Sequence, residues 1–307
     1  MKDTIGNPLS WSAHEAAVLG KKIGLIATHI GHETDDLAHP VVRRITVQDL
    51  RDVLRKGVED FGACRTDVIA LCLFYPVIGV LLAWIAFDRN LVPLLFPVIS
   101  GFALIGPVAG VGLYEMSRMR EKGEEPSWGH AFAVVKSPSF GAIAALGLLL
   151  GGIFVVWMLT AHGIYYATLG PRAPASVGAF VRDVFTTGAG WMMIIVGCAV
   201  GFLFAALVLA ASVVSFPLLL DRDVGLPVAV ITSLRVAAAN PLPIAVWGLV
   251  ATTGLVIGSI PLFLGLIVVM PVLGHATWHL YRRTVAVELH IERRVEVRNT
   301  WETRSDP

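Results

Sequence analysis

Residues 188–220 read GAGWMMIIVGCAVGFLFAALVLAASVVSFPLLL, and this stretch without a charged residue decides the class of the protein. An α-helix needs roughly 20 apolar residues to cross a hydrocarbon core that is about 30 Å thick. The whole chain has the same character, because 55% of its residues are hydrophobic and 15% are charged, with a mean hydropathy of +0.72. A soluble domain averages about 25% charged residues. The composition therefore predicts an all-helical integral membrane protein.

Four further stretches are long and uncharged, and the last of them, 241–281, is too long for one span. As one helix it would extend about 60 Å at roughly 1.5 Å per residue. The turn residues Gly258-Ser259-Ile260-Pro261 lie near its middle, so we divide it there. Pro217 similarly ends the helix of the opening stretch early. The sequence thus predicts six spans, over 68–87, 91–114, 140–161, 191–212, 241–259 and 262–281.

Positive charges fall almost entirely on one side of this arrangement. Of the 24 Lys and Arg residues, three lie on the opposite side, namely Arg89, Arg172 and Arg182. Cytoplasmic segments carry the excess of Lys and Arg. We therefore expect both termini in the cytoplasm, with a flexible polar tail over 1–45, a membrane domain over 46–283 and a cytoplasmic tail over 284–307. The net charge of +1 excludes a nucleic-acid partner bound through overall charge.

A short amphipathic helix is predicted on the cytoplasmic side before each pair of spans. The first covers 46–61, where Thr46 and Asp49 come close to a capping box. The second covers 127–138 and the third about 227–240, each with apolar residues at helical spacing. Helices of this type lie at the membrane surface with the apolar face in the lipid. The predicted fold class is therefore an all-α membrane protein with six transmembrane helices in three hairpins, each preceded by such a helix.

Two of the predicted hairpins end alike, since the spacing of Pro107, Val108, Gly110 and Arg118 recurs exactly 164 residues later. The second set is Pro271, Val272, Gly274 and Arg282. This identity indicates an internal duplication, although apolar segments also share Pro, Val and Gly by chance.

No Asp, Glu, Lys or Arg lies inside any predicted span. Ion-coupled transporters and voltage sensors place such groups at membrane depth, so the sequence disfavours these classes. A permease or channel for a neutral or lipid-like solute is an alternative function. It would need a polar pocket, and the hydroxyl residues available for one are Ser100, Thr160, Ser212, Thr252, Thr253 and Ser259.

His275 and His279 are four residues apart in the last predicted span, so both face the same side of the helix. Two imidazoles at this spacing suit a transition metal, and a haem ligand is the related possibility. A metal- or haem-handling membrane protein is therefore a second alternative function. The other interpretation is that both histidines form hydrogen bonds near the cytoplasmic end of the helix, and no cofactor is predicted in that case.

Asp221, Arg222, Asp223 and Asn240 form the most polar motif between the fourth and fifth spans. We expect this interfacial motif to cap helices and to form ion pairs rather than to catalyse a reaction. No catalytic residue is predicted, because the chain has no phosphate-binding loop, nucleophile elbow or zinc-protease helix.

Several motifs of the C-terminal half resemble a bacterial, largely alphaproteobacterial family of predicted multi-pass integral membrane proteins, a domain of unknown function. They are Ser215-Phe-Pro-Leu-Leu-Leu-Asp-Arg-Asp223, Thr232-Ser233, Asn240-Pro241, Trp247-Gly248 and Gly274-His-Ala-Thr-Trp-His-Leu-Tyr-Arg282. The resemblance implies an inner-membrane, all-helical protein and supplies no activity, cofactor or catalytic residue.

The leading hypothesis is a non-enzymatic protein that acts through association with a membrane-protein partner, a second copy of itself or lipid. Small residues favour close contact between helices. The glycines with this spacing are Gly147, Gly151 and Gly152 in the third span and Gly197 and Gly201 in the fourth.

Overall fold

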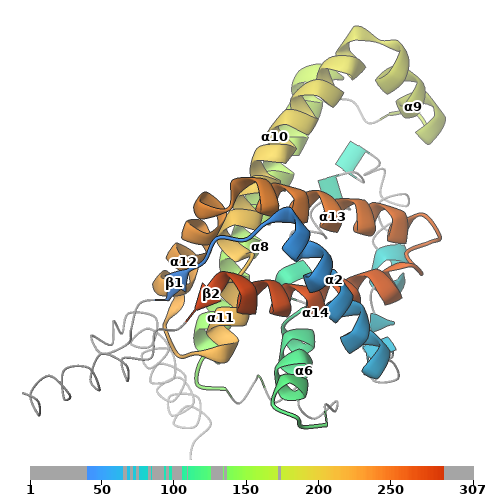
Figure 1. Ribbon diagram of the computed structural model, residues 1–307. Coiled ribbons are helices and arrows are strands. Elements are labelled where there is room, and N and C mark those ends of the chain that lie inside the picture. The colour runs from blue at the N-terminus through green and yellow to red at the C-terminus, as the bar shows by residue number, and fades with distance from the viewer. Residues whose placement is uncertain are drawn as a thin grey trace, which may run out of the picture.

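A computed structural model describes residues 40–286 except 65–67, 70–71, 74–75, 82–83, 85–92, 95–96, 99–105, 109, 126–133, 135–136 and 172–173. Helices make up almost all of the described chain (Figure 1). The exception is a two-stranded antiparallel sheet, in which β1 (Val41–Val42) pairs with β2 (Val285–Ala286). The predicted tails over 1–45 and 284–307 lie largely outside the described residues, and the predicted spans over 68–87 and 91–114 lie partly outside them.

A long hairpin of two apolar helices extends from one side of the molecule (Figure 1). It consists of α8 (Phe140–Thr168) and α10 (Gly188–Ser212), which pack against each other. At its free end lies α9 (Val177–Thr186), which begins at the cap residue Ser176. These two long helices contain the spans predicted over 140–161 and 191–212, and α8 continues for about two further turns, ending shortly before Gly170-Pro171.

The long apolar stretch 241–281 is divided as predicted. It forms α13 (Pro241–Ser259) and α14 (Leu266–Thr284), with a turn between them. Leu262 and Phe263 in this turn have positive φ values of 52° and 64°. In Figure 1, α13 and α14 run in a different direction from α10, so these two hairpins are not side by side as a simple parallel bundle would require.

The chain leaves α10 through two short helices. After Val213 and Val214 it forms α11 (Ser215–Asp221), which contains Pro217 in its first turn, where proline is tolerated. Then α12 (Leu226–Ala239) follows and ends before Asn240-Pro241, which confirms the helix predicted over about 227–240. Ile231 and Leu234 on the predicted apolar face are exposed, whereas the smaller Ala229, Thr232 and Ser233 face inward.

The first predicted amphipathic helix is α2 (Val47–Ala63), and the capping box between Thr46 and Asp49 is present. Its apolar face packs against α14. This face was predicted to lie in lipid, and the contact with α14 prevents that. Leu50 and Val53 are buried there, and a Cβ atom on Gly57 would lie 2.7 Å from the Cβ of Ala276. The glycine therefore allows the two helices to approach closely. The second predicted amphipathic helix, over 127–138, lies mostly outside the described residues.

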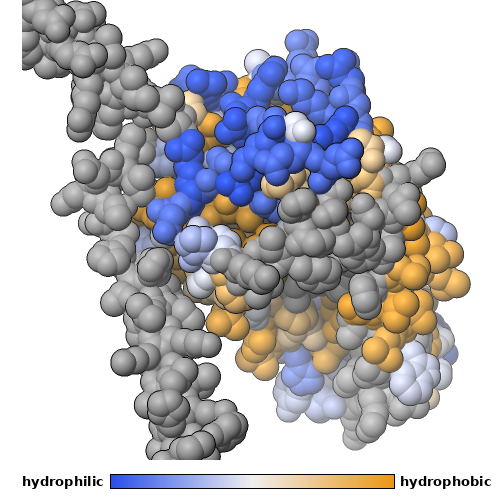
Figure 2. All heavy atoms as spheres, turned by 90° about the horizontal axis from the view of Figure 1, so that it is seen from below, coloured by the Kyte–Doolittle hydropathy of each residue, from blue (hydrophilic) through white to orange (hydrophobic). Residues whose placement is uncertain are grey.

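The helix α6 (Val111–Glu121) packs against α11 and α14. These helices meet at the end of the molecule where polar side chains gather, which we call the polar end. Figure 2, which looks at this end from below, shows hydrophilic side chains gathered over one part of the surface and hydrophobic ones over another.

By length and composition, three helical segments of the described chain can cross a membrane: Phe140–Thr168, Gly188–Asp221 and Pro241–Ser259. Of the most apolar 18-residue stretch of the second segment, only 6% is buried inside the protein. The predicted sixth span is not among them, because the C-terminal half of α14 carries the polar residues His275, His279, Arg282 and Arg283.

Candidate functional site

Charged and polar side chains gather in two neighbouring clusters where α2, α6, α11 and α14 meet. We name them after their central carboxylates, the Asp60 cluster and the Asp221 cluster. The Asp60 cluster joins α2, α6 and α14, and the Asp221 cluster joins α6, α11 and α14. Because α6 and α14 contribute to both, the clusters share a single polar end of the molecule.

The Asp60 carboxylate is 5% exposed and accepts hydrogen bonds from three side chains. Ser117 Oγ donates to Oδ2 at 2.7 Å, and His279 Nε2 lies 2.9 Å from the same oxygen. Arg120 forms an ion pair with Oδ1. His275 extends the network, because its Nδ1 lies 2.7 Å from Ser117 Oγ. A buried carboxylate is tolerated only when paired and hydrogen-bonded, and here both oxygens are engaged.

The ionised state of Asp60 follows from these contacts. Burial alone raises the pKa of this carboxyl, but the hydrogen bonds from His279 and Ser117 and the charges of the histidines outweigh burial and lower it. Asp60 is therefore a carboxylate at neutral pH, and Ser117 must give its single hydroxyl proton to it.

This proton assignment fixes the tautomer of His275. Since the Ser117 hydroxyl proton goes to Asp60, Nδ1 of His275 must be the donor to Ser117 Oγ. In the neutral imidazole Nε2 is then the acceptor, and within the described part of the chain this buried atom has no partner in hydrogen-bond geometry.

A metal site is not assembled by the two histidines in the described part of the chain. No group of three His, Cys, Asp or Glu side chains there is placed to hold a metal ion. His275 and His279 instead direct one ring nitrogen each to Ser117 and Asp60. Both histidines thus form hydrogen bonds with side chains of the neighbouring helices α6 and α2.

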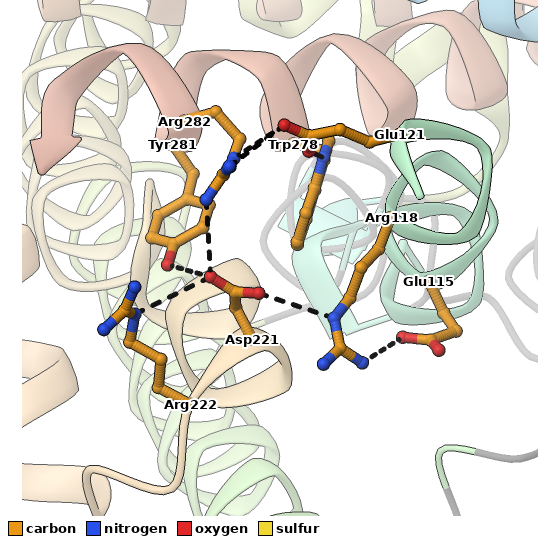
Figure 3. Close-up of polar contacts among 8 residues, drawn as sticks. All are labelled: Glu115, Arg118, Glu121, Asp221, Arg222, Trp278, Tyr281 and Arg282. Atoms are coloured by element: carbon orange, nitrogen blue, oxygen red, sulfur yellow. Dashed lines mark hydrogen bonds and ion pairs between the residues drawn. The ribbon is translucent and has the colours of Figure 1, made fainter. Parts of the chain in front are cut away.

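The Asp221 carboxylate is surrounded by donors from three helices (Figure 3). Tyr281 Oη donates a hydrogen bond to Oδ2 at 2.8 Å. Arg118 Nε lies 3.4 Å from Oδ1, while Arg222 Nε and Arg282 Nη1 each lie 3.7 Å from Oδ2. One carboxylate at the end of α11 thus holds α6 and α14 together.

Two glutamates of α6 balance the remaining positive charge of this cluster. Glu115 pairs with Arg118 at 3.3 Å, and Glu121 accepts hydrogen bonds of 3.0 Å from both Arg282 and Trp278 (Figure 3). The three arginines and three carboxylates of the cluster therefore cancel in charge, so its residues are engaged with one another.

The repeated arginines of the sequence meet at this point. Arg118 and Arg282, which occupy equivalent positions at an offset of 164 residues, contact opposite oxygens of Asp221. The helices α6 and α14, which lie at the predicted ends of two hairpins, thus share one counter-ion.

The remaining residues of the predicted interfacial motif lie apart. Asp223 is exposed. Asn240 is buried, and its amide donates to the carbonyl oxygens of Arg43 and Val236 at 3.1 Å and accepts from the N–H of Ile45 at 2.7 Å. Its side chain therefore pairs with the extended segment after β1 in the way a neighbouring strand would, and serves a structural purpose.

Sequence reasoning missed Asp60, Ser117 and Arg120 as members of the site. Asp60 lies within the first predicted amphipathic helix, and no role was assigned to it. A signal was present, because Leu50, Val53, Gly57 and Asp60 recur at helical spacing on one side. An acidic residue that continues an apolar stripe indicates a buried partner.

The hydroxyl groups proposed for a pocket do not converge in the described chain. Thr160, Ser212 and Ser259 each donate to the carbonyl oxygen four residues earlier in the same helix. Thr252 and Thr253 are exposed on α13, and Ser100 lies outside the described residues. These positions give the permease hypothesis no pocket to support it.

Residues 95–221 match the model of a family described as predicted integral membrane protein (DUF2189), whose function is unknown. No curated protein and no solved structure matches the chain. The matched range contains the hairpin of α8 and α10 and ends at Asp221. It includes the first part of one motif on which the family resemblance rested, while the other motifs follow it. The chain is therefore an integral membrane protein.

Proposed function

We propose that this integral membrane protein is non-enzymatic and acts by association, through the α8–α10 hairpin, with a membrane-protein partner, a second copy or lipid. We place it in the bacterial inner membrane, with six spans and both termini in the cytoplasm. The observation that carries the proposal is a contrast between the polar end of the molecule and the α8–α10 hairpin. Both clustered carboxylates, Asp60 and Asp221, are engaged within the protein, whereas the apolar faces of the hairpin are uncovered.

The glycines of the hairpin support a contact between helices. Gly147 faces Val108 and Gly201 faces Trp157, so these two are used inside the protein. A Cβ atom on Gly151, Gly152 or Gly197 would meet nothing within 4 Å. Small residues on an open face let a second helix approach closely in a membrane.

The distribution of charge supports the orientation. The arginines of α6, α11 and α14 lie at the polar end, whereas Arg182 lies on α9 at the free end of the hairpin. With the predominance of Lys and Arg in the segments assigned to one side, this favours a cytoplasmic polar end.

The proposal is tested by purifying the full chain from its native membrane in a mild detergent and measuring bound proteins and lipids by quantitative mass spectrometry. We expect a stoichiometric component that is lost in Gly151→Leu or Gly197→Leu, because a bulky side chain blocks the open face without a clash inside the protein. Gly163→Leu is the matched control, since it also meets open space but lies outside the small-residue spacing.

Two results would contradict this function. One is a monomer without a stoichiometric protein or lipid in several mild detergents. The other is an equal loss of the bound component in Gly151→Leu and Gly163→Leu, which would remove the small-residue face from the contact.

A further inference from the structure

The short helix α9 presents two different rows of exposed residues at the free end of the hairpin. Val177, Val181 and Phe185 recur every four residues, and Val181 and Phe185 are 47% and 58% exposed. The adjacent exposed row is Gly178, Arg182 and Thr186. A helix with an apolar row beside a polar row is typical of segments that lie in the plane of a membrane surface.

The direction of these rows is fixed by contacts with the hairpin. Ser176 caps the start of α9 by accepting a hydrogen bond of 3.1 Å from Ala179. Phe180 packs on Tyr165 of α8, with ring centroids 6.3 Å apart. At the other end, Gly190 lies so close to the backbone of Val184 that a side chain would not fit. The exposed rows of α9 are therefore held in a defined orientation.

The apolar row of α9 continues into the exposed face of α10. Phe185 meets Trp191 edge to face, with ring centroids 6.5 Å apart, and the Trp191 indole donates to the Phe185 carbonyl at 3.1 Å. Trp191 is itself exposed, and so is Ile195 one turn further along α10. The exposed apolar surface of α9 is thus continuous with the exposed apolar surface of the hairpin.

The position of this helix along the hairpin matches the edge of a bilayer. From Trp191 to Ser212, α10 extends about 32 Å at roughly 1.5 Å per residue, close to the hydrocarbon thickness of about 30 Å. Exposed Tyr166 lies near the end of α8 at the same tip. Tyr and Trp are enriched at the level of the lipid headgroups, so α9 begins where the hydrocarbon core ends.

We propose that α9 is a membrane-surface helix that inserts Val177, Val181 and Phe185 into the phospholipid leaflet farthest from the polar end. Arg182, on the neighbouring row, then lies at the level of the headgroup phosphates. The inference rests on the proposed function in one respect, which is the placement of the α8–α10 hairpin in a membrane. It adds that the hairpin is held at its far end by lipid and not by a protein partner.

The test places a fluorescent label at single positions of the full chain in vesicles of phosphatidylethanolamine and phosphatidylglycerol. The background is Cys198→Ser, because Cys198 is exposed whereas Cys64 and Cys72 are buried. Labels are attached to Val181→Cys on the apolar row and to the matched control Arg182→Cys on the polar row. Phe202→Cys on the exposed face of α10 reports on the hairpin itself. Quenching is measured with bromine on the lipid acyl chains and with aqueous iodide.

We expect the label at position 181 to be quenched several-fold more by brominated lipid than the label at position 182, with the reverse order for iodide. Equal access of iodide to both positions would overturn the inference, because α9 would then stand in water. Protection of position 181 from both quenchers would also overturn it in favour of a protein contact. A label at position 202 that lipid does not quench would instead refute the placement of the hairpin, so the two failures are distinguishable.

Discussion

The contact between α2 and α14 differs from the hairpin of α8 and α10 in how the surfaces of the helices are used. Between α2 and α14, a glycine brings the backbones together and a buried carboxylate receives donors from three side chains. In the hairpin, the helices touch along one side and leave large apolar residues uncovered on the others. The difference teaches that this chain obtains its specific structure at the polar end, where water or headgroups are near, and leaves the hairpin surface for contacts with lipid or other helices.

The strongest test of this comparison is the substitution Asp60→Asn. It removes the buried carboxylate that Ser117, His279 and Arg120 contact, so we expect a loss of about 3 kcal/mol in the free energy of unfolding. The measurement is denaturant unfolding of the full chain in detergent micelles. Glu59→Gln on the exposed side of the same helix is the control and should change stability by less than about 1 kcal/mol. Equal effects of the two substitutions would show that the Asp60 cluster does not hold the helices together.

A pair of leucines on α8 separates its inner and outer faces. Leu146 is fully buried, whereas Leu148 is 78% exposed. We expect Leu146→Ala to lower the free energy of unfolding by about 3 kcal/mol, since it leaves a cavity. Leu148→Ala should have almost no effect, because lipid or detergent surrounds this side chain in both the folded and the unfolded chain. A large loss of unfolding free energy in both variants would mean that protein covers the outer face of α8. The description of the hairpin as uncovered would then be contradicted.

Two glycines of α2 test the close approach to α14. In an exposed helix position, Gly→Ala stabilises by up to about 1 kcal/mol. Gly62 has nothing within 4 Å of a Cβ atom, so Gly62→Ala should be neutral or stabilising. Gly57→Ala should destabilise by about 1–2 kcal/mol, because its methyl group would press on Val272 and Ala276. Thermal unfolding midpoints give the sign of each change, and the same sign for both would contradict the tight contact.

The smallest expected effect concerns acid. Hydrogen bonds from Thr46 and the contact with Arg283 lower the pKa of Asp49 to about 2 from 3.8. A carboxyl group with a lowered pKa stabilises the folded state above its unfolded pKa, and this contribution is lost as the pH falls from about 4 towards 2. We expect Asp49→Asn to flatten the acid dependence of the unfolding midpoint in this range. Asp52→Asn serves as the control. If the unaltered chain already showed an acid dependence as shallow as that of Asp49→Asn, the assignment would be contradicted.

Local patterns carried most of the prediction that the structure supports. The capping residues of α2, the turn at 258–261 and the apolar run of α10 each fix a helix or its end through short-range chemistry. Span ends were less well predicted. Trp157 lies near the end of the predicted span 140–161, where tryptophan is enriched at the level of the headgroups, yet it is buried within α8 and packs on Phe204 of α10. The sequence alone does not show whether an aromatic ring contacts lipid headgroups or a neighbouring helix.

The polar end was beyond local reasoning, because its members come from four separate helices. Asp60 and His279 are 219 residues apart in sequence, and Asp221 lies between segments that were assigned to different hairpins. The sequence does place His275 and His279 on one face. It does not say that a carboxylate from α2 would meet them there, and a metal was the natural alternative in its absence.

The pairing of β1 with β2, together with the Asn240 amide that joins residues 43 and 45, has a consequence for how the protein is made. The strand at the beginning of the described domain finds its partner only in the strand that follows α14, which leaves the ribosome last among these elements. Until synthesis reaches Ala286, residues 41 and 42 have no strand to pair with. The two ends of the described domain are therefore joined at one place, and the pairing of β1 with β2 can form only in a chain that is synthesised at least as far as Ala286.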